Sequence, residues 1–236
     1  MRVRALTGVA GPAVFTAAWI AGSLRQTGQG ALRVQLSGLA AADARDPWIM
    51  ITGFLVLGAC MIVFGQELAV ELPGLAPRLV QAAGVLTVAV GLLRRDHLEL
   101  TSGPGSWHNQ AHTIVSLVLC GDLVLAQLLL ARSCGRADAA SAATAASAAT
   151  GTAAASTAAA GTAWRGWRPF LLASAIATGA ALAVFVPNIN SPDGGVLQRV
   201  AVSIPLLAIS AVAVRLAARG RLASPASRRR LARAAR

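Results

Sequence analysis

The sequence contains no lysine and no tyrosine, and its 236 residues include few charges of either sign. Charged residues make up 13% of the chain and aromatic residues 4%, whereas hydrophobic residues make up 56%. A soluble domain normally carries about a quarter charged residues, so this balance excludes an ordinary soluble fold. Several charge-free windows are also long enough to cross about 30 Å of hydrocarbon. The composition therefore predicts an integral membrane protein whose main partner is a lipid bilayer.

Because lysine is absent, arginine supplies all 21 positive charges, and together with nine acidic residues they give a formal net charge of +12. In a soluble protein such a charge would suggest a nucleic acid partner. Many of these arginines lie beside a hydrophobic run, in residues 215–236, so we expect no nucleic acid partner. The Arg-rich tail, residues 218–236, is instead predicted to contact anionic inner-leaflet lipids, at roughly 1 kcal/mol per residue near the surface. The oligomeric state does not follow from these features.

Cysteine is scarce, and Cys60, Cys120 and Cys134 follow no disulfide or metal-binding spacing. We expect all three to be small buried hydrophobic residues.

Six hydrophobic segments predict an all-α, polytopic bundle of six transmembrane helices. They cover residues 6–24, 48–68, 75–93, 107–131, 170–186 and 196–216. The first segment could be the apolar part of a signal peptide, but it is long for that role and a poor cleavage site follows it. Pro47 and Trp48 suit the start of the second span, because proline lacks the N–H that is unpaired there and tryptophan favours the membrane interface.

An alanine-, serine- and threonine-rich stretch divides the chain. We expect residues 1–132 to hold the first four helices, 133–166 to form a cytoplasmic linker, and 167–217 to hold the last two helices. The linker is long enough to span a bilayer, but alanine gains little in lipid and its hydroxyl residues oppose insertion. Its alanine content is compatible with partial helix formation.

The distribution of arginine predicts that both termini are cytoplasmic. With six spans, fifteen arginines lie in the segments on the side of the termini and six on the opposite side. Cytoplasmic loops are enriched in arginine and lysine, so this orientation is favoured. The first, third and fifth connections then share the outer face of the membrane.

Most of the side chains that could bind a ligand or take part in catalysis lie on that face. We predict a polar outer-face binding site among them, built from six residues: Ser37, Asp96, His108, His112, Gln198 and Arg199.

His108 and His112 are four residues apart, so they share one face of a helix. With Asp96 as a third ligand they could hold a divalent metal such as zinc, and Glu99 is the alternative carboxylate. The spacing is equally compatible with two interfacial histidines that hydrogen-bond the loop to the bundle. Proton transfer and binding of a lipid headgroup are further alternatives.

Asp122 is the acid that lies well inside a span. A charge at that depth is costly, so we expect the side chain to face the bundle interior. It lies fourteen residues after His108, on roughly the same helix face, which would suit a proton or ion path. A buried hydrogen bond between helices is the other interpretation.

Arg199 opens the sixth span on the side that disfavours cations. An ion pair with Asp96 or Asp193 would offset this placement, and contact with an anion or a phosphate headgroup is the alternative.

Several short motifs, in order, resemble a known bacterial membrane family. They are Gly11-Pro12, Ser37-x-Leu39-Ala40-Ala41 followed by Pro47, Gly53-Phe54, Asp96, His108-x-x-x-His112, and Gly195-Val196-Leu197-Gln198-Arg199. On these residues the chain resembles the family called domain of unknown function 998. The resemblance implies a six-helix integral membrane protein and no established activity. Where that family tends to carry Phe-Pro-x-Asp-Pro, this chain has Leu93-Arg94-Arg95-Asp96-His97, which keeps only the aspartate.

We therefore predict a multi-pass protein of a bacterial plasma membrane whose outer-face site binds a lipid headgroup, a small solute or a metal. Whether it is an enzyme stays open. One alternative is a membrane-embedded, metal-dependent lipid hydrolase that uses His108, His112 and Asp96, assisted by Ser37 or Glu99. Another is a small proton-coupled transporter that uses Asp122, although no internal repeat supports a carrier. The third is a purely structural protein.

Overall fold

The structure is a computed structural model of the 236-residue chain. It describes residues 3–26, 32–98, 105–149, 164 and 166–222. Within these residues every regular element is helical. Six helices are long and apolar enough to cross a membrane, which confirms the predicted all-α, six-span architecture.

The six long helices begin and end close to the predicted span limits, with one exception. They are α1 (Thr7–Arg25), α2 (Trp48–Glu71), α3 (Leu75–Leu92), α4 (Trp107–Ala149), α6 (Trp167–Phe185) and α7 (Gly194–Leu222). Short 3-10 turns cover Val3–Leu6 (η1), Gly38–Ala40 (η2) and Val186–Asn188 (η4). The exception is α4, which extends for 43 residues and so continues into the segment expected to be a linker. The rest of that segment, except Trp164 and Gly166, lies outside the described residues.

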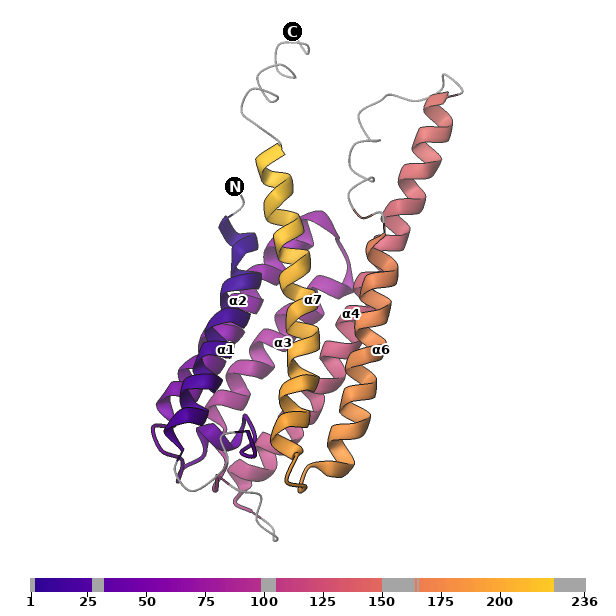
Figure 1. The fold of residues 1–236 in the computed structure, drawn as a ribbon. Coiled ribbons are helices and arrows are strands. Elements are labelled where there is room, and N and C mark those ends of the chain that lie inside the picture. Colours follow the sequence, from indigo (N-terminus) through magenta and orange to yellow (C-terminus); the bar gives the residue numbers. More distant parts are fainter. Residues whose placement is uncertain (1–2, 27–31, 99–104, 150–163, 165, 223–236) are drawn as a thin grey trace.

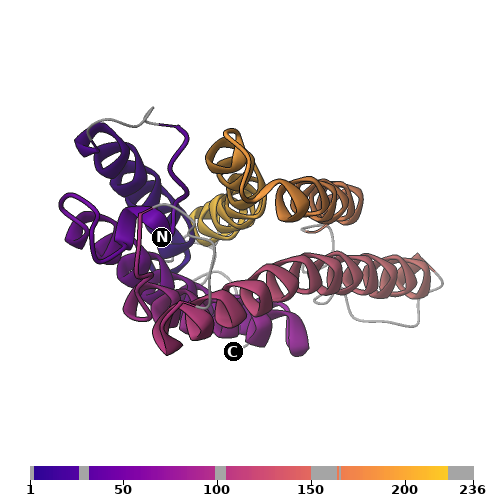
Figure 2. The same ribbon diagram turned by 90° about the horizontal axis from the view of Figure 1, so that it is seen from below.

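The helices form a closed bundle in chain order. Each long helix packs against the next, and α7 closes the bundle by packing against α1 as well as α6. The end-on view shows the yellow α7 between the indigo α1 and the orange α6 (Figure 2). Sequence neighbours are antiparallel, so alternate connections lie at opposite ends of the bundle (Figure 1).

Glycines allow the first three helices to approach closely. A Cβ atom added to Gly58 on α2 would lie 2.5 Å from the carbonyl oxygen of Gly84 on α3, and one added to Gly84 would lie 2.6 Å from that of Gly58. Gly11 on α1 likewise faces Cys60, at 2.6 Å from a hypothetical Cβ to the Cys60 Cβ. Small residues at such crossings increase van der Waals contact where lipid provides no hydrophobic driving force.

Candidate functional site

The first, third and fifth connections lie together at one end of the bundle (bottom of Figure 1). We call this the polar end and define it by the described residues 32–47, 93–98 and 189–193. Segment 32–47 folds across the helix ends, where its Gly38 abuts the backbone of Leu98. The predicted meeting of these three connections is therefore present in the structure.

Arg199 anchors segment 32–47 to α7. Its side chain is only 6% exposed, and its Nη1 atom donates to the carbonyl oxygens of Leu32 (3.1 Å), Val34 (2.8 Å) and Gly195 (2.8 Å). The Nη2 atom donates to Ser23 Oγ at 2.8 Å, and the guanidinium lies 5.1 Å from the centre of the Trp19 ring. The fork of donors in a guanidinium suits such multiple contacts.

The expected ion pairs of Arg199 with Asp96 or Asp193 are not formed. Asp96 bonds instead to Ser106, and no hydrogen bond or ion pair joins Asp193 to Arg199 among the described residues. Carbonyl oxygens of Leu32 and Val34, in segment 32–47, accept the hydrogen bonds of Arg199 that a carboxylate was expected to accept.

Arg95 holds the same segment from the third connection. Its buried Nη1 atom lies 3.2 Å from Gln35 Oε1 and 3.5 Å from Ser37 Oγ, and Gln35 in turn donates to the carbonyl of Ile189 at 2.6 Å. Burial lowers the pKa of Arg95, while the nearby Asp43 and Asp96 carboxylates act in the opposite direction. Arg95 and Gln35 were not among the six predicted site residues, because neither lies in a motif or at a distinctive spacing.

Gln198 completes the connection between segment 32–47 and α7. Its Oε1 atom accepts a 2.7 Å hydrogen bond from the backbone N–H of Leu36. Three of the predicted site residues, Ser37, Gln198 and Arg199, are thus brought together, and the hydrogen bonds described for them are within the protein.

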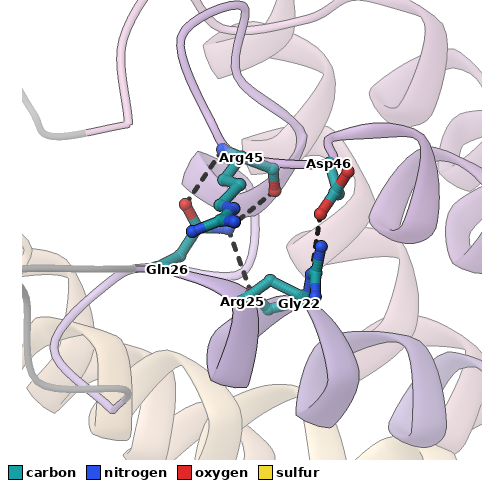
Figure 3. Close-up of polar contacts among 5 residues, drawn as sticks. All are labelled: Gly22, Arg25, Gln26, Arg45 and Asp46. Carbon is teal, nitrogen blue, oxygen red and sulfur yellow. Dashed lines mark hydrogen bonds and ion pairs between the residues drawn. The ribbon is translucent and has the colours of Figure 1, made fainter.

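The end of α1 is tied to the other end of segment 32–47 (Figure 3). Arg25 Nε donates to Asp46 at 2.7 Å, and this contact, together with the charges of Arg25 and Arg45, holds the pKa of the Asp46 carboxyl below its usual value. Gln26 donates to the carbonyls of Gly22 and Arg45 and accepts from the Arg45 N–H at 3.0 Å. The segment is therefore held at both of its ends.

Asp96 positions the start of α4. One carboxylate oxygen accepts from the Ser106 N–H at 2.7 Å and the other from the Ser106 hydroxyl at 2.6 Å. Ser106 Oγ also accepts from the Asn109 N–H at 3.3 Å, which is the usual contact of an N-cap serine. The two bonds from Ser106 lower the pKa of Asp96, because they favour its ionised form, and His97 and His108 act in the same direction.

The two histidines of α4 have different surroundings. His112 is 3% exposed, and its Nδ1 atom donates to the carbonyl oxygen of Leu93 at 2.6 Å. His108 is exposed and stacks on Trp107, with 3.7 Å between the ring centres. One histidine therefore fastens α4 to the end of α3, and the other lies on the surface.

The predicted metal ligands are not assembled into a site. Among the described residues, no group of three or more histidine, cysteine, aspartate or glutamate side chains is placed to hold a metal ion. Asp96 is instead hydrogen-bonded to Ser106, and of the two histidines His112 is buried whereas His108 is exposed. The alternative ligand Glu99 lies outside the described residues.

Asp122 lies away from this end, fifteen positions after the first residue of α4. It is half-buried, its Oδ2 atom is buried, and that atom has no hydrogen-bond partner within the described part of the chain. The nearest polar network on α4 joins Gln127 to α6, where Ser174 Oγ donates to Gln127 Oε1 at 2.5 Å and Gln127 Nε2 donates to Thr178 Oγ1 at 3.2 Å. This network connects the helices α4 and α6 through buried hydrogen bonds.

Comparison with known proteins identifies a family. No curated protein and no solved structure matches the chain. A family model described as "Protein of unknown function (DUF998)" matches residues 9–169, a range that includes Asp96, His108 and His112 and ends before Gln198 and Arg199. Because this match covers more than half of the chain, and the fold has the six spans that the motifs implied, the protein belongs to the DUF998 family of unknown function.

Proposed function

We propose that the protein binds the headgroup of a phospholipid at the polar end and does not catalyse a reaction there. The observation that carries this proposal is the exposed Trp107–His108 stack at the first turn of α4. Trp107 is 66% exposed, and tryptophan in membrane proteins concentrates at the level of the headgroups. An imidazole stacked on it lies at the depth of a lipid phosphate.

Basic side chains on the third connection supply further donors. Arg94 and His97 are exposed on the third connection, and the bonds of Arg94 to the carbonyls of Ala40 and Ala41 are long, at 3.4 and 3.5 Å. A guanidinium binds phosphate oxygens through charge-assisted hydrogen bonds, and an imidazole N–H also donates to them. In the proposed site His108, Arg94 and the Nε2 atom of His97 contact the phosphate, and Asp96 orients the start of α4. The Nδ1 atom of His97 is already paired with the Asp43 carboxylate at 3.2 Å.

The other predicted site residues have a supporting role in this proposal. Ser37, His112, Gln198 and Arg199 hold segment 32–47 and α4 in place by internal hydrogen bonds. They set the shape of the polar end and do not contact the headgroup.

Binding is favoured over catalysis because the site offers donors without an activated nucleophile. In the described residues no serine or cysteine is hydrogen-bonded to a histidine, which is the usual arrangement for activating one. The metal-dependent lipid hydrolase has weaker support, since its three ligands are not assembled. Binding of zinc by the purified protein, lost in a His112→Ala variant, would restore it.

The proposal includes the membrane and the orientation. The proposed location is a bacterial plasma membrane. The arginine distribution supports cytoplasmic termini, an orientation in which the polar end lies on the outer face. In this orientation the tail, residues 218–236, contacts anionic lipids of the inner leaflet; most of it lies outside the described residues.

Lipid titration of the purified full-length protein, read by native mass spectrometry, tests the proposed site. The probes are phosphatidylglycerol and diacylglycerol, which differ by the phosphate-bearing headgroup. The test variant combines Arg94→Ala with His108→Ala. The matched control combines Arg78→Ala with Arg132→Ala, which removes two exposed arginines at the opposite end of the bundle.

We expect the test variant to raise the Kd for phosphatidylglycerol by roughly tenfold and to leave that for diacylglycerol unchanged. The control variant should bind both lipids as the wild type does. Competition by inorganic phosphate would distinguish a free phosphate from a headgroup. Equal loss of affinity in both variants would show that the binding is unspecific and would end the proposal.

A further inference from the structure

We propose that the lipid bound at the polar end carries a primary ammonium group next to its phosphate, as phosphatidylethanolamine does, and that Asp43 binds this ammonium group. The inference rests on the proposed function, because it concerns the class of headgroup that the same site selects. The observation behind it is an exposed carboxylate beside the basic side chains assigned to the phosphate.

The chain around Asp43 runs alongside the third connection. The Ala42 N–H donates to the carbonyl oxygen of Arg95 at 3.0 Å, and the Leu98 N–H donates to Asp43 Oδ1 at 2.5 Å. These two contacts hold the Asp43 side chain beside the basic residues of that connection.

Arg94 and Asp43 place opposite charges at the surface of the polar end. Both residues are exposed, and Arg94 Nη2 lies 3.5 Å from the carbonyl oxygen of Ala41, two positions before Asp43. Within the part of the chain that the structure describes, no ion pair joins Arg94 to Asp43. Both groups therefore remain able to bind a ligand.

Asp43 has acceptor positions that the protein does not use. Its side chain is 50% exposed, its Oδ1 atom accepts from the Leu98 N–H, and its Oδ2 atom is paired with His97 Nδ1 at 3.2 Å. An ionised carboxylate has roughly four acceptor positions, so about two remain for other donors. An ammonium group supplies three N–H donors together with the positive charge that complements a carboxylate.

His97 separates the two halves of the proposed site by the width of one imidazole ring. Its Nδ1 atom is on the side of Asp43, and its Nε2 atom, across the ring, is the one assigned to the phosphate. In an ethanolamine headgroup a two-carbon chain joins the phosphate to the ammonium group. That chain can follow the ring from one nitrogen to the other, so a single headgroup contacts both halves.

The charges around this site favour a zwitterion over a lipid with a net negative charge. The charged side chains of the third connection and Asp43 add up to no net charge when the histidines are neutral; they are Arg94, Arg95, Asp43 and Asp96. A negatively charged lipid gains no long-range attraction from a neutral set of groups. A headgroup with one negative and one positive group matches the separated charges at short range.

Lipid titration of the purified full-length protein, read by native mass spectrometry, tests this selectivity. The probes are phosphatidylethanolamine and phosphatidylglycerol with identical acyl chains, which share the phosphate and differ in the ammonium group. The test variant is Asp43→Asn, which keeps an oxygen for the Leu98 N–H and removes the negative charge. The matched control is Asp193→Asn, which removes the charge of an exposed acid in the fifth connection of the same end.

We expect the wild type to bind phosphatidylethanolamine more tightly than phosphatidylglycerol, by roughly fivefold. Asp43→Asn should remove this preference by weakening the binding of phosphatidylethanolamine. It should bind phosphatidylglycerol at least as tightly as the wild type does, because a negative charge near the phosphate is lost. Asp193→Asn should keep the preference. Equal affinities of the wild type for the two lipids, or a preference that survives in Asp43→Asn, overturns the inference, and so does an equal loss of preference in both variants.

A comparison on the wild type alone keeps the test valid if Asp43→Asn fails to fold. Phosphatidylcholine carries the same charges as phosphatidylethanolamine, but its ammonium group has no N–H donor. It should therefore bind the wild type more weakly, and equal binding of these two lipids overturns the role of Asp43.

The variant that combines Arg94→Ala with His108→Ala separates this inference from the proposed function. It should weaken the binding of phosphatidylethanolamine and phosphatidylglycerol alike, because both contain the phosphate. If it does so while the wild type shows no preference, the phosphate site stands and the selection of an ammonium group is wrong. If it binds both lipids as the wild type does, the proposed function fails and the inference fails with it.

Discussion

The Arg199 guanidinium donates a 2.8 Å hydrogen bond to the carbonyl oxygen of Val34, which precedes it by 165 positions in the chain. This contact joins the last transmembrane helix to the first connection. It therefore holds together two parts of the polar end that lie far apart in the sequence. Because the acceptors are backbone carbonyls, this contact depends on the arginine and not on the side chains of Leu32 and Val34.

Replacing Arg199 by alanine should destabilise the fold strongly. The change leaves the carbonyls of Leu32, Val34 and Gly195 without this donor, and a buried acceptor left unsatisfied typically costs roughly 1–3 kcal/mol. Arg199→Lys should retain part of the stability, because an ammonium group has three donors but lacks the planar fork. Denaturation in detergent, followed by circular dichroism, measures both. If the lysine variant is as unstable as the alanine variant, a positive charge at this position does not by itself stabilise the fold.

The adjacent residues Arg94 and Arg95 should respond differently to the same substitution. Arg95→Ala removes the buried donor to Gln35 and should cost about 1–3 kcal/mol. Arg94→Ala removes two long contacts of an exposed side chain, so the stability should change by less than about 0.5 kcal/mol. The same denaturation assay compares the two, and an Arg94 effect as large as that of Arg95 would contradict the assigned roles.

The helices could be predicted from sequence because each span is encoded locally. A run of apolar residues long enough to cross a bilayer identifies a transmembrane helix, and Pro47 marks one helix start by its own chemistry. The end of α4 was harder to predict. An alanine-rich sequence favours a helix without requiring lipid, so no change in composition marks where α4 ends.

The contacts at the polar end could be predicted only in part. Counting spans was enough to bring Asp96 and Arg199 to one end of the bundle. It did not give the partners, because a backbone carbonyl such as that of Val34 or Leu93 leaves no mark in the sequence. His112 shows the consequence, since nothing in its spacing from His108 indicates that its Nδ1 atom donates to the Leu93 carbonyl.

The contact between Asp96 and Ser106 should depend on pH only in acid. The pKa of Asp96 in the folded protein is below its ordinary value of 3.8, so the ionised form is the one that stabilises the fold. This contribution is complete above the ordinary value and is lost as the pH falls through the lower, folded value. Protection of the Ser106 amide against hydrogen exchange should therefore stay constant from neutral pH down to about 4 and decrease in stronger acid.

An Asp96→Asn variant is the control for this pH dependence. It removes the titrating group, so any loss of Ser106 protection that it shares with the wild type arises from other acids. Loss of protection in the wild type already near pH 6 would contradict the proposed role of the ionised carboxylate.

The orientation of the bundle should follow the arginine count and place the polar end outside the cell. Ala42 is exposed in segment 32–47, and Ala139 is exposed on α4 beyond the opposite end of the bundle. In a background without native cysteines, a membrane-impermeant maleimide added to intact cells should label Ala42→Cys and not Ala139→Cys, because the arginine-rich side is retained in the cytoplasm. Both positions should be labelled after the cells are permeabilised. The reverse pattern would place Arg94, His97 and His108 on the cytoplasmic side, so their ligand would have to be a lipid of the inner leaflet.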